Sequence, residues 1–130
     1  MPDKGSILVV DDTSDSLRVL AGTLAADGYS VQPADSGELA LAALAHHVPE
    51  LILLDIRMPG IDGFEVCRRL KAEPRTRNIP VVFLSALTEV EDRVEGLKLG
   101  AVDFISKPFR KEELLARARA KGLLRDQAAD

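Results

Sequence analysis

Five side chains that could do chemistry stand at the ends of short apolar runs in this 130-residue sequence. They are three aspartates, a serine and a lysine: Asp11, Asp12, Asp55, Ser85 and Lys107. Carboxylates brought together repel one another, and a divalent cation with open positions for water, Mg²⁺ or Mn²⁺, is the simplest remedy. A carboxylate beside such a cation, a lysine ammonium and a hydroxyl is equipped for phosphoryl transfer, with the carboxylate as nucleophile.

The apolar run before Asp55 indicates a buried strand. Residues 51–54 are four aliphatic residues without polar alternation, which is typical of a strand covered on both faces of a parallel sheet. Pro59 and Gly60 then force a turn. Four further runs predict strands, over residues 6–10, 30–34, 80–84 and 103–106. Pro33 predicts an edge position for its strand, because proline cannot donate a hydrogen bond to a neighbouring strand.

Helices are predicted after each strand. The first extends from the capping side chains of residues 13–15 to Gly28, and the others cover about residues 38–46, 64–72, 89–99 and 111–121. Gly122 is expected to end the last helix, because glycine costs roughly 1 kcal/mol relative to alanine inside a helix.

The strand–helix alternation occurs five times with short connections, so it predicts an α/β fold. Such a pattern gives a parallel sheet with helices on both faces and right-handed crossovers. The carboxyl ends of parallel strands share one edge, and ligands bind outside that edge. The five side chains that could do chemistry are therefore expected to lie together at this edge, the rim of the sheet.

Composition and charge exclude several classes of protein. The chain is 46% hydrophobic and 29% charged, which describes one globular domain, and it contains no apolar run near the roughly 20 residues of a membrane helix. Its net charge of −4 argues against binding of nucleic acid. The single cysteine, Cys67, allows neither a disulfide framework nor a zinc cluster, so we expect a cytoplasmic protein in which Cys67 is a buried apolar group.

Five short stretches, taken in order, resemble the receiver domains of two-component response regulators. They read VVDD at residues 9–12, LDIRMPGIDG at 54–63, VFLSA at 82–86, GAVDF at 100–104 and KPF at 107–109. The resemblance extends from Ile7 to about Leu124. It implies a flavodoxin-like (βα)5 fold, doubly wound, with strand order 2-1-3-4-5.

The resemblance also implies a phosphoacceptor and a metal site. Asp55 would accept a phosphoryl group from the phosphohistidine of a histidine kinase or phosphotransfer domain. Asp12 and Asp55 would bind Mg²⁺ directly with the backbone carbonyl of Arg57, while Asp11 would act through water. Such a domain is a signalling phosphoacceptor, which promotes its own phosphorylation and dephosphorylation with Mg²⁺, and its output is a changed surface for a downstream domain or protein.

The remaining site residues implied by the resemblance form a switch. Ser85 and Lys107 would contact the phosphoryl group, and the Lys107–Pro108 bond would be cis. Phe104 occupies a position at which the family often has tyrosine, and its ring would reorient on activation. A second interpretation, nearly as well supported as the switch, is that Phe104 has only a packing role.

Other interpretations stay open for the acidic residues. Asp11 and Asp12 could simply cap the first helix. An aspartyl-phosphate phosphatase or mutase would need a substrate pocket, often on a second domain, for which the chain has no spare length. A degenerate receiver used only for protein contacts is disfavoured by the intact set of acidic, hydroxyl and ammonium groups.

The domain boundaries expected from the sequence are a disordered lead over residues 1–5, a receiver domain over 6–122, and a C-terminal extension or linker over 123–130. Leu123 and Leu124 lie beyond the predicted core. We therefore expect weak homodimerisation or docking through this end on phosphorylation, and a native chain that continues past Asp130.

Overall fold

The protein is represented by a computed structural model that describes the backbone of residues 4–85 and 90–129, and the side chains of these residues up to Lys121. Across these described parts, none of the helices is both long and apolar enough to cross a membrane.

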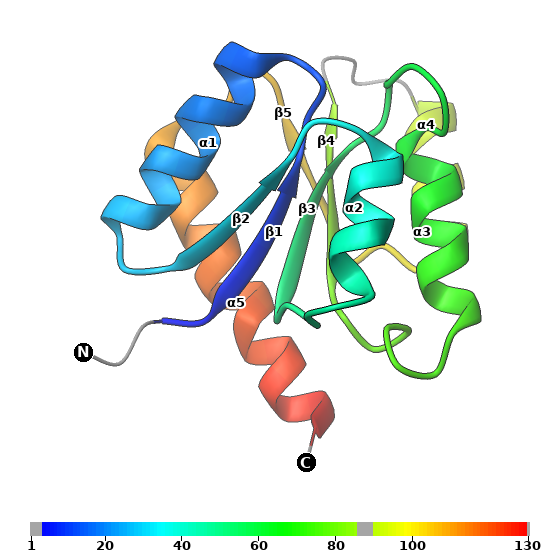
Figure 1. The fold of residues 1–130 in the computed structure, drawn as a ribbon. Helices are drawn as coiled ribbons and strands as arrows, with labels where there is room; N and C mark the ends of the chain where they lie inside the picture. Colours follow the sequence, from blue (N-terminus) through cyan, green and yellow to red (C-terminus); the bar gives the residue numbers. More distant parts are fainter. Residues whose placement is uncertain (1–3, 86–89, 130) are drawn as a thin grey trace.

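Five parallel strands form a single sheet in the order β2-β1-β3-β4-β5 (Figure 1). Their bounds are β1 Ser6–Val10, β2 Ser30–Ala34, β3 Leu51–Asp55, β4 Val81–Ser85 and β5 Asp103–Ser106. The predicted fold class and strand order are confirmed, and the strand that contains Pro33 lies at an edge. The central strand β3 is buried along its whole length.

Helices cover both faces of the sheet, with α1 and α5 on one face and α2, α3 and α4 on the other (Figure 1). Their bounds are α1 Ser14–Ala26, α2 Gly37–Leu44, α3 Gly63–Ala72, α4 Val90–Lys98 and α5 Lys111–Ala129. The residue expected to start the fourth helix, Glu89, lies outside the described residues.

Two hydrophobic cores result, one on each face of the sheet. Leu51 and Leu53 of β3 pack with α1 and α5, whereas Ile52 and Leu54 pack with α2 and α3. This division follows from strand geometry, because successive side chains point to opposite faces. Cys67 is fully buried in the second core, as predicted, and this burial raises the pKa of its thiol.

The predicted end of the last helix is wrong, because α5 passes through Gly122 and continues to Ala129. The roughly 1 kcal/mol cost of a helical glycine is small, and no proline follows it. Leucine and arginine, both good helix formers, come next in the sequence. The side chains of Leu123 and Leu124 lie outside the described residues, so the contact expected there stays a prediction.

The expected disordered lead is also too long, because Lys4 and Gly5 are held in place. The Lys4 amide donates to the Gly28 carbonyl at 3.0 Å, and the Gly5 carbonyl accepts from the Ser30 amide at 2.9 Å. The Lys4 ammonium also lies 3.0 Å from Asp27. These residues extend the pairing of β1 with β2, which the composition of the lead does not reveal.

The start of α3 lies so close to the end of β3 that only glycine fits at position 63. A Cβ on Gly63 would collide with the carbonyl oxygen of Asp55 and would lie 2.9 Å from the Cα of Ile56. Both neighbours are backbone atoms that no rotamer change can move. The contact fixes the turn after Asp55 against the strand.

We therefore predict that Gly63→Ala lowers the free energy of unfolding by about 2–3 kcal/mol, as overpacking does elsewhere. The matched control is Gly22→Ala in α1, where a Cβ would meet nothing within 4 Å. That change should instead stabilise the protein by up to about 1 kcal/mol. Urea unfolding followed by circular dichroism measures both, and equal effects of the two substitutions would contradict the close packing at Gly63.

Candidate functional site

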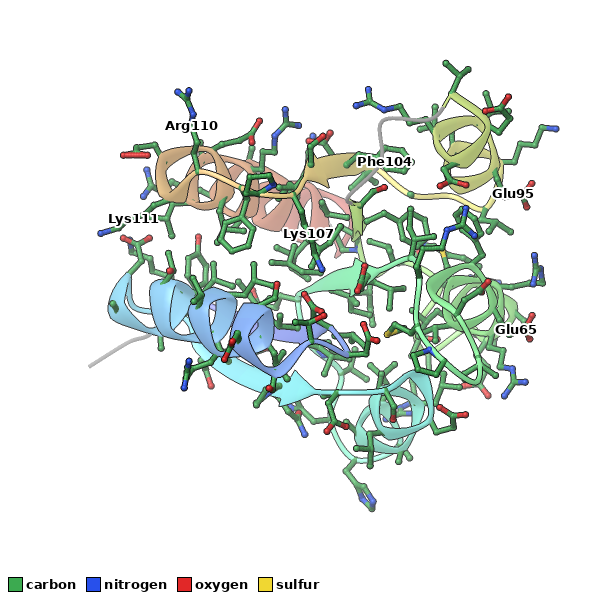
Figure 2. The ribbon with its side chains drawn as sticks, turned by 90° about the horizontal axis from the view of Figure 1, so that it is seen from above. Glu65, Glu95, Phe104, Lys107, Arg110 and Lys111 are labelled. Atoms are coloured by element: carbon green, nitrogen blue, oxygen red, sulfur yellow. The ribbon has the colours of Figure 1, made fainter. Side chains whose placement is uncertain are left out.

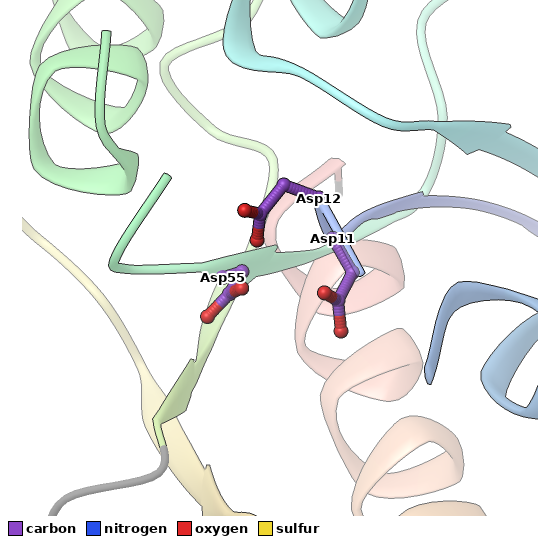
Figure 3. A group of neighbouring side chains, drawn as sticks. All are labelled: Asp11, Asp12 and Asp55. Carbon is purple, nitrogen blue, oxygen red and sulfur yellow. The ribbon is translucent and has the colours of Figure 1, made fainter. Parts of the chain in front are cut away.

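Three carboxylates converge at the carboxyl edge of the sheet (Figure 3). Asp11 and Asp12 directly follow β1, and Asp55 is the last residue of β3. One oxygen of each carboxylate lies within 4.8 Å of the others. The cause is the register of the neighbouring strands, which pairs Val10 with Leu54 and so brings the next residues of both strands together.

The three carboxylates differ in their exposure to solvent. Asp11 is completely buried, Asp55 is 6% exposed, and the side chain of Asp12 faces solvent. The Asp11 carboxylate accepts a hydrogen bond from the Thr13 amide at 3.0 Å, at the start of α1. Thr13 itself makes no side-chain cap, so Asp11 serves the helix end as well as the rim.

Lys107 supplies positive charge to this rim. Its Nζ donates to Asp11 Oδ2 at 2.8 Å and to Asp55 Oδ2 at 3.3 Å. The side chain projects from the connection between β5 and α5 toward the ends of β1 and β3 (Figure 2). The Lys107–Pro108 peptide bond is cis, as predicted.

Ser85 is buried at the end of β4, at the same edge of the sheet. The strand register pairs Leu84 with Asp55, so Ser85 stands one position beyond the last residue of β3. Its carbonyl accepts a hydrogen bond from the Lys107 amide at 2.8 Å. The five side chains singled out in the sequence therefore come from three strand ends and one connection that meet at this rim.

Burial and charge shift the pKa values of these groups in different directions. Burial raises the pKa of Asp55 to about 6; the attraction of Lys107 opposes this rise and the negative charge of Asp11 adds to it. Burial would also raise the pKa of Asp11, but hydrogen bonds from Lys107, Ser16 and the Thr13 amide outweigh it and lower that pKa. Burial would lower the pKa of Lys107, but hydrogen bonding to Asp11 and the attraction of Asp55 raise it.

The donor set fits a hard divalent cation. Three carboxylates face one ammonium, so the rim keeps an excess of negative charge when all of them are ionised. All the clustered donors are carboxylate oxygens, which suit Mg²⁺ or Mn²⁺ better than zinc. A bound cation would relieve the repulsion that Lys107 alone leaves uncompensated.

Phe104 packs toward α4. Its ring centroid is 5.7 Å from that of Phe83, and the Arg93 guanidinium lies 5.9 Å from the Phe104 ring. Gly96 of α4 makes room for it, because a Cβ there would lie 2.6 Å from the Phe104 Cζ. The structure therefore places Phe104 between β5 and α4, and its role as a switch stays a prediction.

One contact near the site was not predicted from the sequence. The side chain of Arg57, two residues after Asp55, pairs with Asp92 of α4. These partners are separated by 35 positions, so no local pattern reveals the pair.

Comparison with known proteins places this arrangement in a family. The family model for the response regulator receiver domain matches residues 7–119. Among curated proteins, the response regulator PleD of Caulobacter vibrioides is 50% identical over 114 residues. The DNA-binding dual master transcriptional regulator RpaA of a Synechocystis species is 42% identical over 114 residues.

These relatives are longer than the region they share with the chain. The alignments cover 88% of the chain in both cases, but only 25% of PleD and 47% of RpaA. The chain thus spans about a quarter to a half of these relatives.

Solved structures agree with the sequence relatives. The chemotaxis response regulator CheY4 of Vibrio cholerae superposes with a TM-score of 0.85 at 30% identity, covering 89% of this chain and 97% of that one. The receiver domain of the Francisella response regulator 1452 gives a TM-score of 0.83 at 30% identity, covering 95% of this chain and 98% of that one.

The chain therefore belongs to the response regulator receiver domain family. It is a phosphoacceptor module of two-component signalling, with the CheY-like order of strands. Domains of this family receive phosphoryl groups from histidine kinases and act on output domains or partners.

The raised pKa of Asp55 makes a testable statement about stability. The folded-state pKa of about 6 lies above the ordinary 3.8, so the folded chain binds more protons between these values and its stability falls as pH rises through them. Above about pH 6 the cost of the ionised group is fully present. Asp55→Asn should therefore raise the free energy of unfolding at about pH 7.5 by about 1–3 kcal/mol, and by much less at about pH 4.

Thermal unfolding at both pH values, without divalent cations, measures this effect. Asp15→Asn is the matched control, because Asp15 is an exposed aspartate of α1 paired only with Arg18 in the described residues. Its effect should stay within about 0.5 kcal/mol at either pH. A stability gain for Asp55→Asn that does not depend on pH would contradict the burial argument.

Proposed function

We propose that Asp55 is the phosphoacceptor of this receiver domain and that the donor is the phosphohistidine of a histidine kinase or phosphotransfer domain. The observation that carries the proposal is the buried Asp55 carboxylate at a strand end, held by Lys107 beside two further aspartates. In the transfer, an Asp55 oxygen forms a bond to phosphorus as the bond to the histidine nitrogen breaks, and the electron pair of that bond stays on the imidazole.

The metal site proposed for this transfer uses the same rim. Asp12 and Asp55 would bind Mg²⁺ or Mn²⁺ directly together with the Arg57 carbonyl, and Asp11 would act through water. A cation held by these residues would neutralise charge on the phosphoryl oxygens. Two features support the division of roles: Asp12 is the exposed carboxylate, whereas Asp11 is buried and already engaged with Lys107 and Thr13.

Lys107 and Ser85 are the proposed contacts of the transferred group. The Lys107 ammonium bridges Asp11 and Asp55, so it stands beside the carboxylate to which phosphorus would be attached. A hydrogen bond donated by Ser85 would favour a conformation in which the end of β4 moves toward the phosphoryl group. Phosphorylation can shift the population of conformations only through contacts that differ between them.

A groove beside Lys107 supports approach of the donor from this side. Val19 of α1, Pro108 and Phe109 line it, and its volume is about 530 Å³. Val19 is 53% exposed, so the groove presents apolar surface next to the acceptor. The donor and output proteins are identified only by their class. We also propose a cytoplasmic location for the domain, with no nucleic acid or membrane bound to it.

We predict that acetyl phosphate labels the protein with one phosphate at Asp55, and only when Mg²⁺ or Mn²⁺ is present. The cation is needed because an anionic donor must approach a cluster of carboxylates. Intact-mass spectrometry measures the added phosphate. Asp55→Asn should abolish it, and Asp12→Asn should raise the cation concentration needed for half-maximal labelling.

Glu73→Gln, which changes an exposed carboxylate at the C-terminal end of α3, is the matched control and should be labelled as fully as the wild type. Equal labelling of Asp55→Asn, or labelling in an excess of chelator, would refute Asp55 as a metal-dependent acceptor.

Ser85→Ala should separate phosphate acceptance from the response to it. The variant keeps Asp55 and Lys107, so we expect labelling within about threefold of the wild type. Loss of an essential transition-state contact would lower labelling far more. Its amide NMR shifts in α4 on phosphorylation should fall to less than half of the wild-type values. Wild-type shifts in this variant would remove Ser85 from the mechanism.

A further inference from the structure

Arg57 and Asp92 join the turn after β3 to the first turn of α4. The Arg57 Nη2 donates to both carboxylate oxygens of Asp92, at 2.7 and 2.9 Å. Arg57 stands two residues after Asp55, in the connection between β3 and α3. Asp92 is the third residue of α4, where the positive end of the helix dipole also favours a carboxylate.

The pair is asymmetric in its burial. The Asp92 side chain is 10% exposed, whereas that of Arg57 is 61% exposed. A buried carboxylate that loses its cation is strongly disfavoured, so Asp92 depends on Arg57 more than Arg57 depends on Asp92. The position of the first turn of α4 is therefore tied to the position of the Arg57 side chain.

The other described contacts of α4 with neighbouring elements are one longer ion pair, the contact of the Arg93 guanidinium with the Phe104 ring, and apolar packing. Arg68 of α3 approaches Glu95 at 3.9 Å, and both side chains are about half exposed. Gly96 packs against Phe104 and Phe83 on the sheet. Because these contacts lie further along the helix, Arg57–Asp92 is the polar link between the rim and the beginning of α4.

Arg57 also carries the backbone carbonyl proposed as a metal ligand. Its carbonyl and side chain share one Cα, so a shift of this backbone segment that carries the carbonyl toward a cation also moves the base of the side chain that holds Asp92. Conversely, an Asp92-bound side chain restricts the orientations of the carbonyl. The structure contains the Arg57–Asp92 pair together with the cluster of three carboxylates, which lie within 4.8 Å of one another. The pair is therefore compatible with the arrangement proposed to bind the cation.

We propose that Asp92 is a positioning residue for the metal and phosphoryl site, which it orients through Arg57, and that the pair couples cation binding at the rim to the position of α4. This inference rests on the proposed function, because it needs Mg²⁺ to bind at Asp55 and the Arg57 carbonyl. Coupling between two sites is reciprocal, so loss of the pair must weaken both cation binding and the response of α4.

The test is a Mg²⁺ titration of the whole chain followed by amide NMR. In the wild type, Mg²⁺ should shift the resonances near Asp12 and Asp55 and also those of Val94, Gly96 and Leu97 in α4. In Asp92→Asn and Arg57→Gln, the resonances near the carboxylates should still shift, but with a Kd about two- to fivefold weaker, the size expected for a single partly exposed ion pair.

In both variants the α4 shifts should fall below half of the wild-type values. The double variant should be no worse than either single variant, because a pair that acts as a unit is lost only once. Arg57→Lys keeps the charge and should recover at least half of the α4 response. Glu91→Gln removes an exposed carboxylate from the same turn of α4 and should change nothing.

Thermal unfolding checks that each variant is folded, and the substitutions at the exposed Arg57 carry the test if Asp92→Asn is unstable. A wild-type Kd and wild-type α4 shifts in Arg57→Gln would overturn this inference while leaving Asp55 as acceptor. Additive effects in the double variant, or an equal loss in Glu91→Gln, would also overturn it. A wild type whose resonances do not respond to Mg²⁺ would overturn the proposed function and this inference together.

Discussion

The site depends on one electrostatic constraint, which is the placement of three carboxylates at a single sheet edge with one ammonium between two of them. Lys107 lies within hydrogen-bonding distance of both Asp11 and Asp55. It holds the pKa of Asp11 low and limits the rise that burial imposes on Asp55. The rim still carries more negative than positive charge, and this residual charge suits it to a divalent cation, with which we propose that a phosphoryl donor reaches Asp55.

The fold keeps these groups close together although their charges repel. Two cores cover the sheet, and the alternate residues of β3 are anchored in one or the other. The end of β3 is further held by the start of α3, where Gly63 lets two stretches of backbone meet. The polar groups therefore stand on strand ends whose positions are set by burial of apolar side chains, and Lys107 offsets part of the repulsion between the carboxylates.

The surface that would report on the site lies on the same side as α4. Arg57 and Phe104 reach this helix from two directions, one from the rim and one from the edge strand β5. Val90, Val94 and Leu97 of α4 are exposed. A receiver domain works by presenting different surfaces in different states. Through Arg57, the coupling proposed above would link the rim to this exposed apolar helix face.

The sequence alone determined the order of the helices and strands, the class of fold and which residues gather at the rim. Unbroken aliphatic runs, glycine and proline punctuation and five strand–helix repeats are local patterns, and parallel topology then requires the strand ends to meet. Tertiary structure decided what these patterns do not contain. Asp11 and Asp12 are neighbours in sequence, yet one is buried and the other exposed, because only the folded rim distinguishes them. The local cost of Gly122 does not end α5, and Asp92 meets Arg57 across 35 positions. Such features follow from the sum of many contacts between distant segments, which no short stretch of sequence encodes.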